Sequence, residues 1–299
     1  MSKSRFGLLS YPGIDNIGDT IQSLAARRFF PRVDVLLPRE RLSDPPISEG
    51  RPVKTILNGW FMHNAAYWPP HPAIEPLLVS MHFVEPGRSR LRCWIKSPLA
   101  RMLSGPGAEF LRRWGPVGAR DEYSLEQLTA RRIPAYHSGC LTLTLPRPDV
   151  AHHKNVLAVD LTPQALLCLK SRTRRRVISL THSCDPTLDQ VGQEQTATKL
   201  LSLYAGAAAV VTPRIHAAQP CLAFGTPVLL VTPDKPSRRV ADVARLMQTC
   251  PLSDFIAGSC DYNFDNPPAN PESFRPLADA LIARCQNFVQ DESLPLVGY

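Results

Sequence analysis

The chain has 299 residues, a formal net charge of +8, 44% hydrophobic residues and 20% charged residues. This length suggests two domains, and the hydrophobic share excludes a mainly disordered chain. No apolar run approaches the ~18–20 residues of a membrane span, and residues 1–20 lack the order of a signal peptide, so we expect a cytoplasmic protein.

In the first half of the chain, apolar runs and helix-periodic segments alternate between clusters of proline. Strands are predicted over residues 4–11, Thr55–Leu57, Leu77–His82 and Ala135–Leu145. Helices are predicted over Gly18–Phe30, Ala100–Trp114 and Asp121–Arg132. The stretch Pro146-Arg147-Pro148 then indicates a domain boundary, with domains expected at residues 1–150 and 151–299.

The second half alternates more regularly between short apolar runs and helical segments. Strands are predicted over Asn155–Asp160, Arg176–Thr181, Ala207–Thr212 and Pro227–Thr232. Helices are predicted over Pro163–Lys170, Leu188–Tyr204, Pro213–Phe224, Lys235–Gln248 and Pro271–Val289. Near-continuous apolar strands separated by helices are typical of a parallel sheet covered on both faces, so the expected class is α/β and Rossmann-like.

Ligands of open α/β sheets bind beyond the carboxyl ends of the strands. Three segments at predicted strand ends are candidates for such a site. In the first, Tyr11–Gln22, Asn16, Gly18 and Asp19 form an Asn-x-Gly-Asp turn in which the backbone can approach a ligand. Neither GxGxxG nor a P-loop lysine is present, which disfavours a dinucleotide or nucleoside triphosphate site. A simple strand–helix turn capped by Asp19 explains the same residues.

The second segment is Gly118-Ala119-Arg120-Asp121. Arg120 is expected where a helix begins, so its guanidinium and the helix dipole can act on one anion. A surface arginine paired with Asp121 or Glu122 is the structural alternative.

The third segment is Thr212-Pro213-Arg214-Ile215-His216, after a buried strand. Thr212 is predicted as the helix N-cap and Pro213 as the first helical residue, which places Arg214 and His216 in or near the first turn. Free amides there favour an anion, and the imidazole can serve as acid or base. A core or capping role for His216 is the structural alternative.

Arginine supplies most of the positive charge, with one dense run at Arg172-Thr173-Arg174-Arg175-Arg176. Such a run usually lies on a solvated surface, and it can also attract anionic lipid or a phosphorylated substrate. No nucleic-acid motif accompanies it, so we expect no nucleic-acid partner. The eight dispersed cysteines include no CxxC pair, which favours buried, reduced thiols over a zinc or redox site.

Three motifs in order resemble the polysaccharide pyruvyl transferase family. They are Asn16-x-Gly18-Asp19-x-x-Gln22, Gly118-x-Arg120-Asp121, and Thr212-x-Arg214-Ile215-His216 before Gly225-Thr226-Pro227. The resemblance spans about Phe6 to Val231 and includes Leu57-Asn58-Gly59-Trp60. It implies two Rossmann-like domains facing a cleft, as in type B glycosyltransferases, with a C-terminal helix that packs back on the first domain.

The resemblance also implies an activity: transfer of the pyruvyl group of phosphoenolpyruvate to a sugar of a polysaccharide, such as an exopolysaccharide, or of its lipid-linked precursor. No cofactor is expected, and the enzyme is expected in the cytoplasm, with peripheral contact to an anionic membrane surface as an option. By resemblance, His216 is the catalytic acid/base, Arg120 binds the donor from the facing wall of the cleft, and Ile215 packs on the donor. Arg214 either binds phosphate or holds its loop, and Asp19, with Asn16 and Gly18, is a candidate for orienting the acceptor.

Two other functions fit the same scaffold. A nucleotide-sugar glycosyltransferase would require a nucleotide cradle, which the second half of the sequence does not clearly show. A non-catalytic glycan-binding relative would not require Arg120, Arg214 and His216 together. Fold alone does not choose among the three.

Overall fold

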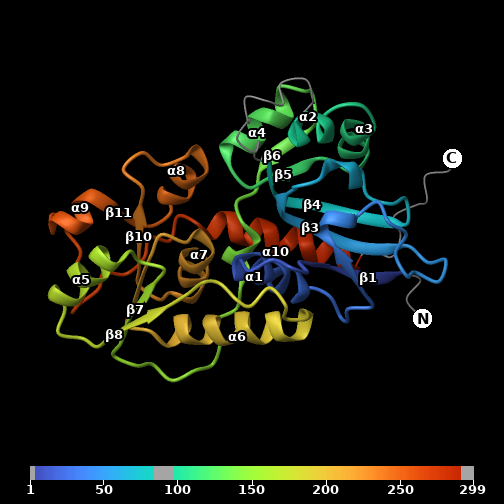
Figure 1. Cartoon of the computed structure of the whole chain (residues 1–299). Coiled ribbons are helices and arrows are strands. Elements are labelled where there is room, and N and C mark those ends of the chain that lie inside the picture. The colour runs from blue at the N-terminus through green and yellow to red at the C-terminus, as the bar shows by residue number, and fades with distance from the viewer. Residues whose placement is uncertain (1–3, 84–96, 291–299) are drawn as a thin grey trace. The chain divides into compact units, whose positions relative to one another are not determined.

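The computed structural model of the chain describes residues 4–83 and 97–290, which form two compact units (Figure 1). The first unit contains residues 4–11, the described part of 23–141, and 279–290. The second contains Pro12–Gln22 and Thr142–Ala278. Each unit is built on one parallel sheet with helices, which confirms the predicted α/β class and its two Rossmann-like parts.

The first unit has a six-stranded sheet in the order β2-β1-β3-β4-β5-β6. Its strands are β1 (Arg5–Ser10), β2 (Val35–Pro38), β3 (Val53–Phe61), β4 (Ile74–Phe83), β5 (Val117–Ala119) and β6 (Ala135–His137). Its helices are α2 (Pro98–Met102), α3 (Gly105–Trp114) and α4 (Glu122–Thr129), together with the second half of α1 (Ile17–Arg27). The central strands β3 and β4 are almost wholly buried, as expected for the inner strands of a parallel sheet covered on both faces.

The C-terminal helix α10 (Arg275–Gln290) returns to the first unit from Asp279 onward, which confirms the expected return of this helix. The ammonium group of Lys54, on β3, donates a hydrogen bond to the backbone carbonyl of Phe288 at 3.0 Å. The guanidinium of Arg284 lies 4.2 Å from the ring centre of Tyr136, on β6. These contacts attach α10 to strands β3 and β6 of the first unit, and Cys285 of the same helix is buried.

The second unit has a five-stranded sheet in the order β11-β10-β9-β7-β8. Its strands are β7 (Val156–Val159), β8 (Val177–Leu180), β9 (Ala209–Thr212), β10 (Val228–Thr232) and β11 (Gln248–Pro251). Its helices are α5 (Pro163–Ser171), α6 (Gln190–Gly206), α7 (Ile215–Phe224), α8 (Arg238–Ala244) and α9 (Leu252–Ala257). Helices α5 and α9 lie side by side (Figure 1), and Ala165, Leu169 and Phe255 from them pack on buried strand residues.

The order of these strands identifies one edge of the second sheet as the place for a ligand. From β7 the chain crosses to β8 on one side and then returns to β9 on the other side of β7. The strand order therefore reverses between β7 and β9, and such a reversal opens a crevice at the carboxyl ends of the strands. The residues that follow Val159 and Thr212 flank that point.

Several element predictions need correction. The predicted strand Ala135–Leu145 ends at His137, and a 3₁₀ turn occupies Leu141–Thr144, because Gly139 takes a positive φ of 68° that ends the extended chain. The predicted helix Ala100–Trp114 is two helices, α2 and α3, separated at Ser104, before Gly105 with its φ of 52°. The predicted helix Lys235–Gln248 is shortened to α8, and Gln248 instead begins the edge strand β11.

Seven cysteines lie in the described ranges, and all are free thiols, five of them buried and two, Cys168 and Cys184, partly exposed. The eighth, Cys93, lies outside the described residues. In the parts of the chain that the structure describes, none of the helices combines the length and apolarity needed to cross a membrane.

Candidate active site

The first turn of α7 carries the histidine that the sequence singled out. The helix begins at Ile215 with Arg214 as its N-cap residue, so the predicted start, with Thr212 as cap and Pro213 inside the helix, is wrong. The Thr212 hydroxyl instead accepts a hydrogen bond from the backbone N–H of Arg214 at 3.0 Å, which holds these residues in a turn before the helix. His216 is the second residue of α7, so its place in the first turn is as predicted.

His216 packs against Gly18 at the start of α1. The side chain of His216 is only 8% exposed. A Cβ atom added to Gly18 would lie 2.8 Å from the Nδ1 atom of His216 and 3.1 Å from its Cβ atom. The position therefore requires glycine because the imidazole occupies the space of a side chain.

The motif around Gly18 builds the first turn of α1. Asn16 is exposed and caps the helix, accepting a hydrogen bond from the backbone N–H of Gly18 at 3.2 Å. The Gln22 amide donates to the Asp19 carboxylate at 3.2 Å and to the Gly18 carbonyl at 3.3 Å. Asp19 is buried within this turn rather than serving as its cap.

The same turn is held within the second unit by contacts with residues after β8. The backbone N–H of Ile17 donates to the carbonyl of His182 at 3.3 Å, and Asn16 forms an antiparallel bridge with Ser183. The Thr20 hydroxyl donates to the Gln193 side chain, on α6, at 3.5 Å. Residues from the start of the chain thus form part of the surroundings of His216.

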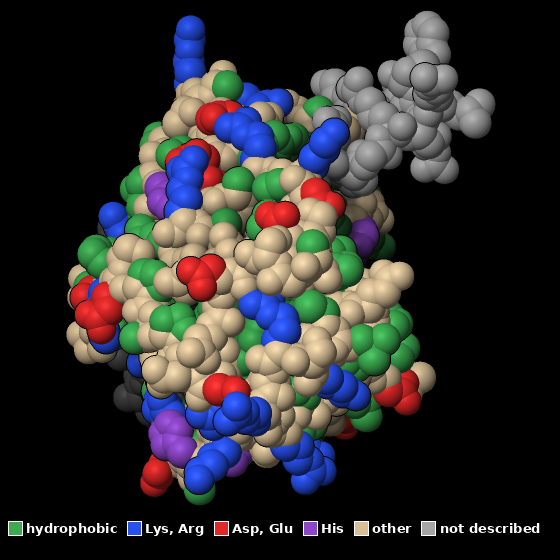
Figure 2. Space-filling model, turned by 90° about the vertical axis from the view of Figure 1, so that its left-hand side faces the viewer, with side chains coloured by type: hydrophobic (Ala, Val, Ile, Leu, Met, Phe, Trp, Pro, Cys, Tyr) green, Lys and Arg blue, Asp and Glu red, His purple; other side chains and the backbone are tan. Residues whose placement is uncertain are grey.

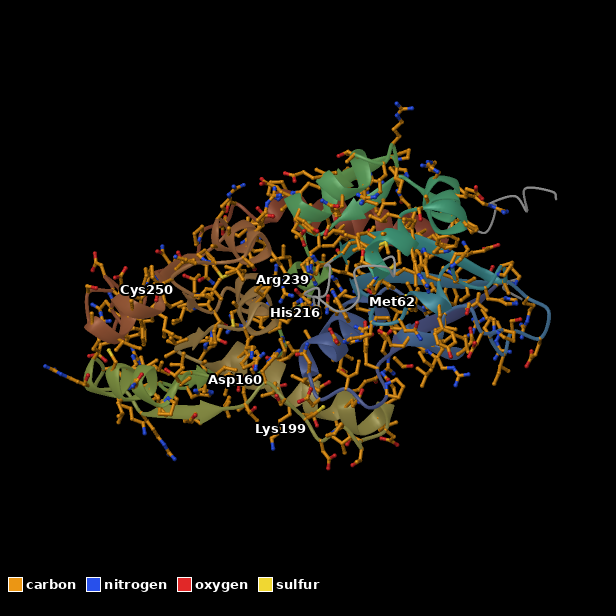
Figure 3. All side chains as sticks on the ribbon, turned by 45° about the horizontal axis from the view of Figure 1, so that its top comes forward. Met62, Asp160, Lys199, His216, Arg239 and Cys250 are labelled. Carbon is orange, nitrogen blue, oxygen red and sulfur yellow. The ribbon has the colours of Figure 1, made fainter. Side chains whose placement is uncertain are left out.

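Asp160 contacts Arg214, although the sequence did not single it out. It follows β7 at the point where the strand order reverses, with a positive φ of 52°. Its Oδ2 atom lies 2.7 Å from the Nε atom of Arg214, and its Oδ1 atom accepts a hydrogen bond from the backbone N–H of His182 at 3.2 Å. Figure 3 shows Asp160 and His216 on the second unit. A polar residue directly after a buried strand was the signal in the sequence.

His182 and Tyr204 form a buried pair beside this ion pair. The Nδ1 atom of His182 lies 3.0 Å from the Tyr204 hydroxyl, and both side chains are at most 2% exposed. Burial lowers the pKa of His182 to about 4, with Asp160 opposing the shift and Arg214 adding to it. Burial also raises the pKa of Tyr204. Both groups are therefore neutral near pH 7, and the charges nearby are those of Arg214 and Asp160.

Arg120 belongs to the first unit, where it lies next to the buried pair of Asp121 and His82. It directly follows β5 and is 5% exposed, and the Nε atom of its side chain lies 3.9 Å from the Oδ2 atom of Asp121. Asp121 caps α4, accepting from the backbone N–H of Ser124 at 2.8 Å, and its Oδ2 atom lies 2.5 Å from the Nδ1 atom of His82. Burial favours a raised pKa for Asp121, but the bond to His82 and the nearby cations lower it to about 2.

This geometry excludes the simple surface arginine that the sequence left open, because both Arg120 and Asp121 are buried. Gly118 lies in a tight space here, since an added Cβ would lie 2.9 Å from the Tyr136 hydroxyl and 3.0 Å from the Cβ atom of Ser138. Within the described residues, no group of three or more His, Cys, Asp or Glu side chains is arranged to hold a metal ion.

The arginine-rich run is partly structural. The Arg175 guanidinium donates to the backbone carbonyl of Asp265 at 2.7 Å, and Arg172 donates to the carbonyl of Cys260. Two of the arginines therefore fix the loop after α9, whereas Arg174 and Arg176 are exposed. On the face shown in Figure 2, basic side chains lie among acidic, apolar and uncharged ones.

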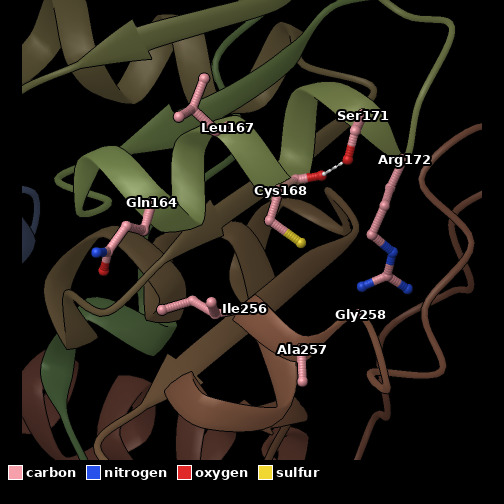
Figure 4. Close-up of a pocket in the computed structure, with 8 residues that line it drawn as sticks. All are labelled: Gln164, Leu167, Cys168, Ser171, Arg172, Ile256, Ala257 and Gly258. Carbon is pink, nitrogen blue, oxygen red and sulfur yellow. Dashed lines mark hydrogen bonds between the residues drawn. The ribbon is translucent and has the colours of Figure 1, made fainter.

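A hollow of about 530 Å³ lies between α5 and α9 in the second unit (Figure 4). Its lining includes the exposed side chains of Leu167 and Ile256, together with Cys168, whose thiol donates to the Phe255 carbonyl. None of the site residues predicted from the sequence lines it. The hollow is therefore separate from the surroundings of His216.

Comparisons with known proteins bear on this arrangement. No curated protein matches the chain significantly. Among solved structures, the chain is similar to UDP-GlcNAc 2-epimerase of Methanocaldococcus jannaschii in complex with UDP-GlcNAc and UDP, at 10% identity and a TM-score of 0.40, over 94% of this chain and 99% of that chain. Residues 106–235, which carry Arg120, Arg214 and His216, match the family of polysaccharide pyruvyl transferases, and the resemblance seen in the motifs is confirmed over that segment.

Proposed function

We propose that the protein transfers the pyruvyl group of phosphoenolpyruvate to two hydroxyls of a glycan, forming a ketal. The observation that carries this proposal is the position of His216, in the first turn of α7 and against the Gly18 turn, inside the segment that matches the pyruvyl transferase family. An imidazole beside a helix N-terminus combines a proton carrier with an anion-binding surface.

The overall reaction requires one proton transfer to carbon and the loss of phosphate. The methylene carbon of the donor gains a proton and becomes a methyl group, while the bond from the central carbon to the phosphate oxygen breaks. Two sugar oxygens form bonds to the central carbon, and the two hydroxyl protons leave them. One of these protons balances the methyl group, and the other leaves with inorganic phosphate. We assign the proton transfers to His216.

The donor carries a phosphate and a carboxylate, so the site must supply positive charge. Ile215 and His216 lie in the first turn of α7, where a helix presents backbone N–H groups and the positive end of its dipole. Together with the Arg214 guanidinium, this helix start suits one anionic group of the donor. We assign the other anionic group to Arg120, and donor packing to Ile215.

The turn of Asn16, Gly18 and Asp19 is assigned to the acceptor side of His216. Asn16 is exposed beside the helix start, and its amide can bind a sugar hydroxyl. Gly18 keeps the space beside the imidazole free of a side chain. Asp19 accepts a hydrogen bond from Gln22, and we assign its carboxylate to orienting a hydroxyl of the acceptor.

The test is incubation of the purified protein with phosphoenolpyruvate and a panel of free and lipid-linked glycans. The expected result is release of phosphate that depends on acceptor, and a product heavier than the acceptor by one pyruvate less one water. Transfer from a nucleotide sugar with release of a nucleoside diphosphate would instead establish a glycosyltransferase. Binding of a glycan without turnover of any donor would identify a non-catalytic relative.

A further inference from the structure

We propose that Asp160 is a positioning residue that holds the Arg214 guanidinium in the orientation that receives the anionic donor. This inference rests on the proposed function, and it concerns a residue that follows β7 rather than one of the three motifs.

Both oxygens of the Asp160 carboxylate are engaged. The Oδ2 atom accepts from the Nε atom of Arg214 at 2.7 Å, and the Oδ1 atom accepts from the backbone N–H of His182 at 3.2 Å. The carbonyl of His182 in turn accepts from the backbone N–H of Ile17, at the start of α1. One carboxylate thereby connects the ends of β7 and β8, the cap of α7 and the turn that packs on His216.

The contact at Nε decides which edge of the guanidinium is available. An arginine has five N–H donors in one plane, and Asp160 uses the one nearest the side-chain stem. The terminal amino groups are left to form two parallel hydrogen bonds with a carboxylate or a phosphate. Because the Arg214 side chain is 50% exposed, it would otherwise sample many rotamers, and fixing it beforehand reduces the ordering cost of binding.

The imidazole of His182 does not compete for this role. Burial holds the pKa of His182 at about 4, so the ring carries no charge near pH 7. His182 contacts Asp160 through the backbone N–H of His182, and this hydrogen bond does not depend on the protonation of the imidazole. The cation that the carboxylate faces is therefore Arg214.

The substitution Asp160→Asn tests this role with little disturbance of the backbone. Asparagine tolerates the positive φ of 52° at this position better than most residues. Its side chain has one acceptor oxygen where aspartate has two, so it can serve Arg214 or His182 but not both. The matched control is Asp265→Asn, which removes an exposed carboxylate that contacts Thr173 and the backbone of Arg174 in the same unit.

The measurement is the dissociation constant of phosphoenolpyruvate by calorimetry, with the melting temperature recorded for each variant. Asp160→Asn should weaken binding by about 2–10-fold, because the Arg214 side chain must then be ordered when the donor binds, while Asp265→Asn leaves binding unchanged. In an Arg214→Ala background, Asp160→Asn should have no further effect, because a positioning residue acts only through its partner.

Three results would overturn the inference. Tighter binding of phosphoenolpyruvate by Asp160→Asn would show that the Asp160 carboxylate only weakens the positive field at the site. Equal losses of affinity with Arg214 present and with Arg214→Ala would show that Asp160 acts without Arg214. If the wild-type protein binds no phosphoenolpyruvate, the proposed function fails. The NMR signal of the Arg214 Nε–H group in the free protein then tests the contact with Asp160 separately. A signal that Asp160→Asn leaves unchanged refutes the positioning contact, and a shifted signal supports it.

Discussion

Replacing Gly18 with alanine should lower turnover strongly and change the stability of the fold only slightly. The new Cβ atom would lie 2.8 Å from the Nδ1 atom of His216 and 3.1 Å from the Oδ1 atom of Asn16. Atoms in normal contact are about 3.5 Å apart or more, so the imidazole must move by roughly 0.7 Å. A displacement of about 1 Å in a catalytic group can reduce the rate about 100-fold, so we expect turnover to fall by about 10–100-fold.

The effect on folding should be smaller, because two terms oppose each other. Overpacking costs about 1–3 kcal/mol, whereas alanine at a helical position gains about 1 kcal/mol over glycine. The net loss is then about 0–2 kcal/mol, or a few degrees in the melting temperature. The assay pairs acceptor-dependent phosphate release with thermal unfolding.

Gly192→Ala is the matched control. Gly192 also lies in the first turn of a helix in the second unit, and the atoms nearest to its added Cβ belong to Leu188 and Asp189, at 3.1 Å or more. It should leave turnover unchanged. Wild-type turnover in Gly18→Ala would refute the reasoning, because the imidazole would then be either elsewhere or dispensable.

Three further predictions test the remaining site residues. His216→Gln should lower turnover by about 10²–10⁴-fold with little change in melting temperature, measured by phosphate release from phosphoenolpyruvate, and a fully active variant would remove the histidine from the mechanism. Arg120→Ala should weaken phosphoenolpyruvate binding by about 10–100-fold in calorimetry, since a charge-assisted contact is worth roughly 1.5–3 kcal/mol, and unchanged affinity would contradict its assignment. The pKa of Asp121 is lowered to about 2 by His82 and Arg120, against burial, so its carboxylate stabilises the folded state fully above about pH 4 and loses that effect as the pH falls toward 2. In urea unfolding, the gap in stability between the wild type and Asp121→Asn should therefore shrink from pH 5 to pH 2, and a constant gap would count against the ion pair.

Local sequence patterns predicted the alternation of strands and helices and the place of His216, because buried strands and helix starts have strong local signals. They failed where a single backbone conformation decides the outcome. The chain leaves the extended conformation at Gly139. The hydroxyl of Thr212 accepts the backbone N–H of Arg214, so α7 begins later than its sequence predicts. Neither event changes the hydrophobic pattern.

The surroundings of His216 were beyond the reach of local patterns for a different reason. The packing of Gly18 on His216, and of Ile17 on His182, joins residues far apart in the sequence. The ion pair of Asp160 and Arg214 likewise depends on strand order, which brings β7 beside β9. The first two pairs depend on where the start of α1 lies, and the third depends on the order of the strands.

The assignment of residues 12–22 to the second unit limits how the protein can be divided. A fragment that begins at Thr142 would contain the whole second sheet and His216 but would lack the turn that packs against the imidazole. It would also lose the partner of the His182 carbonyl, exposing a surface that the intact chain covers. A single cut in the chain therefore cannot release the second unit together with the turn that packs on His216.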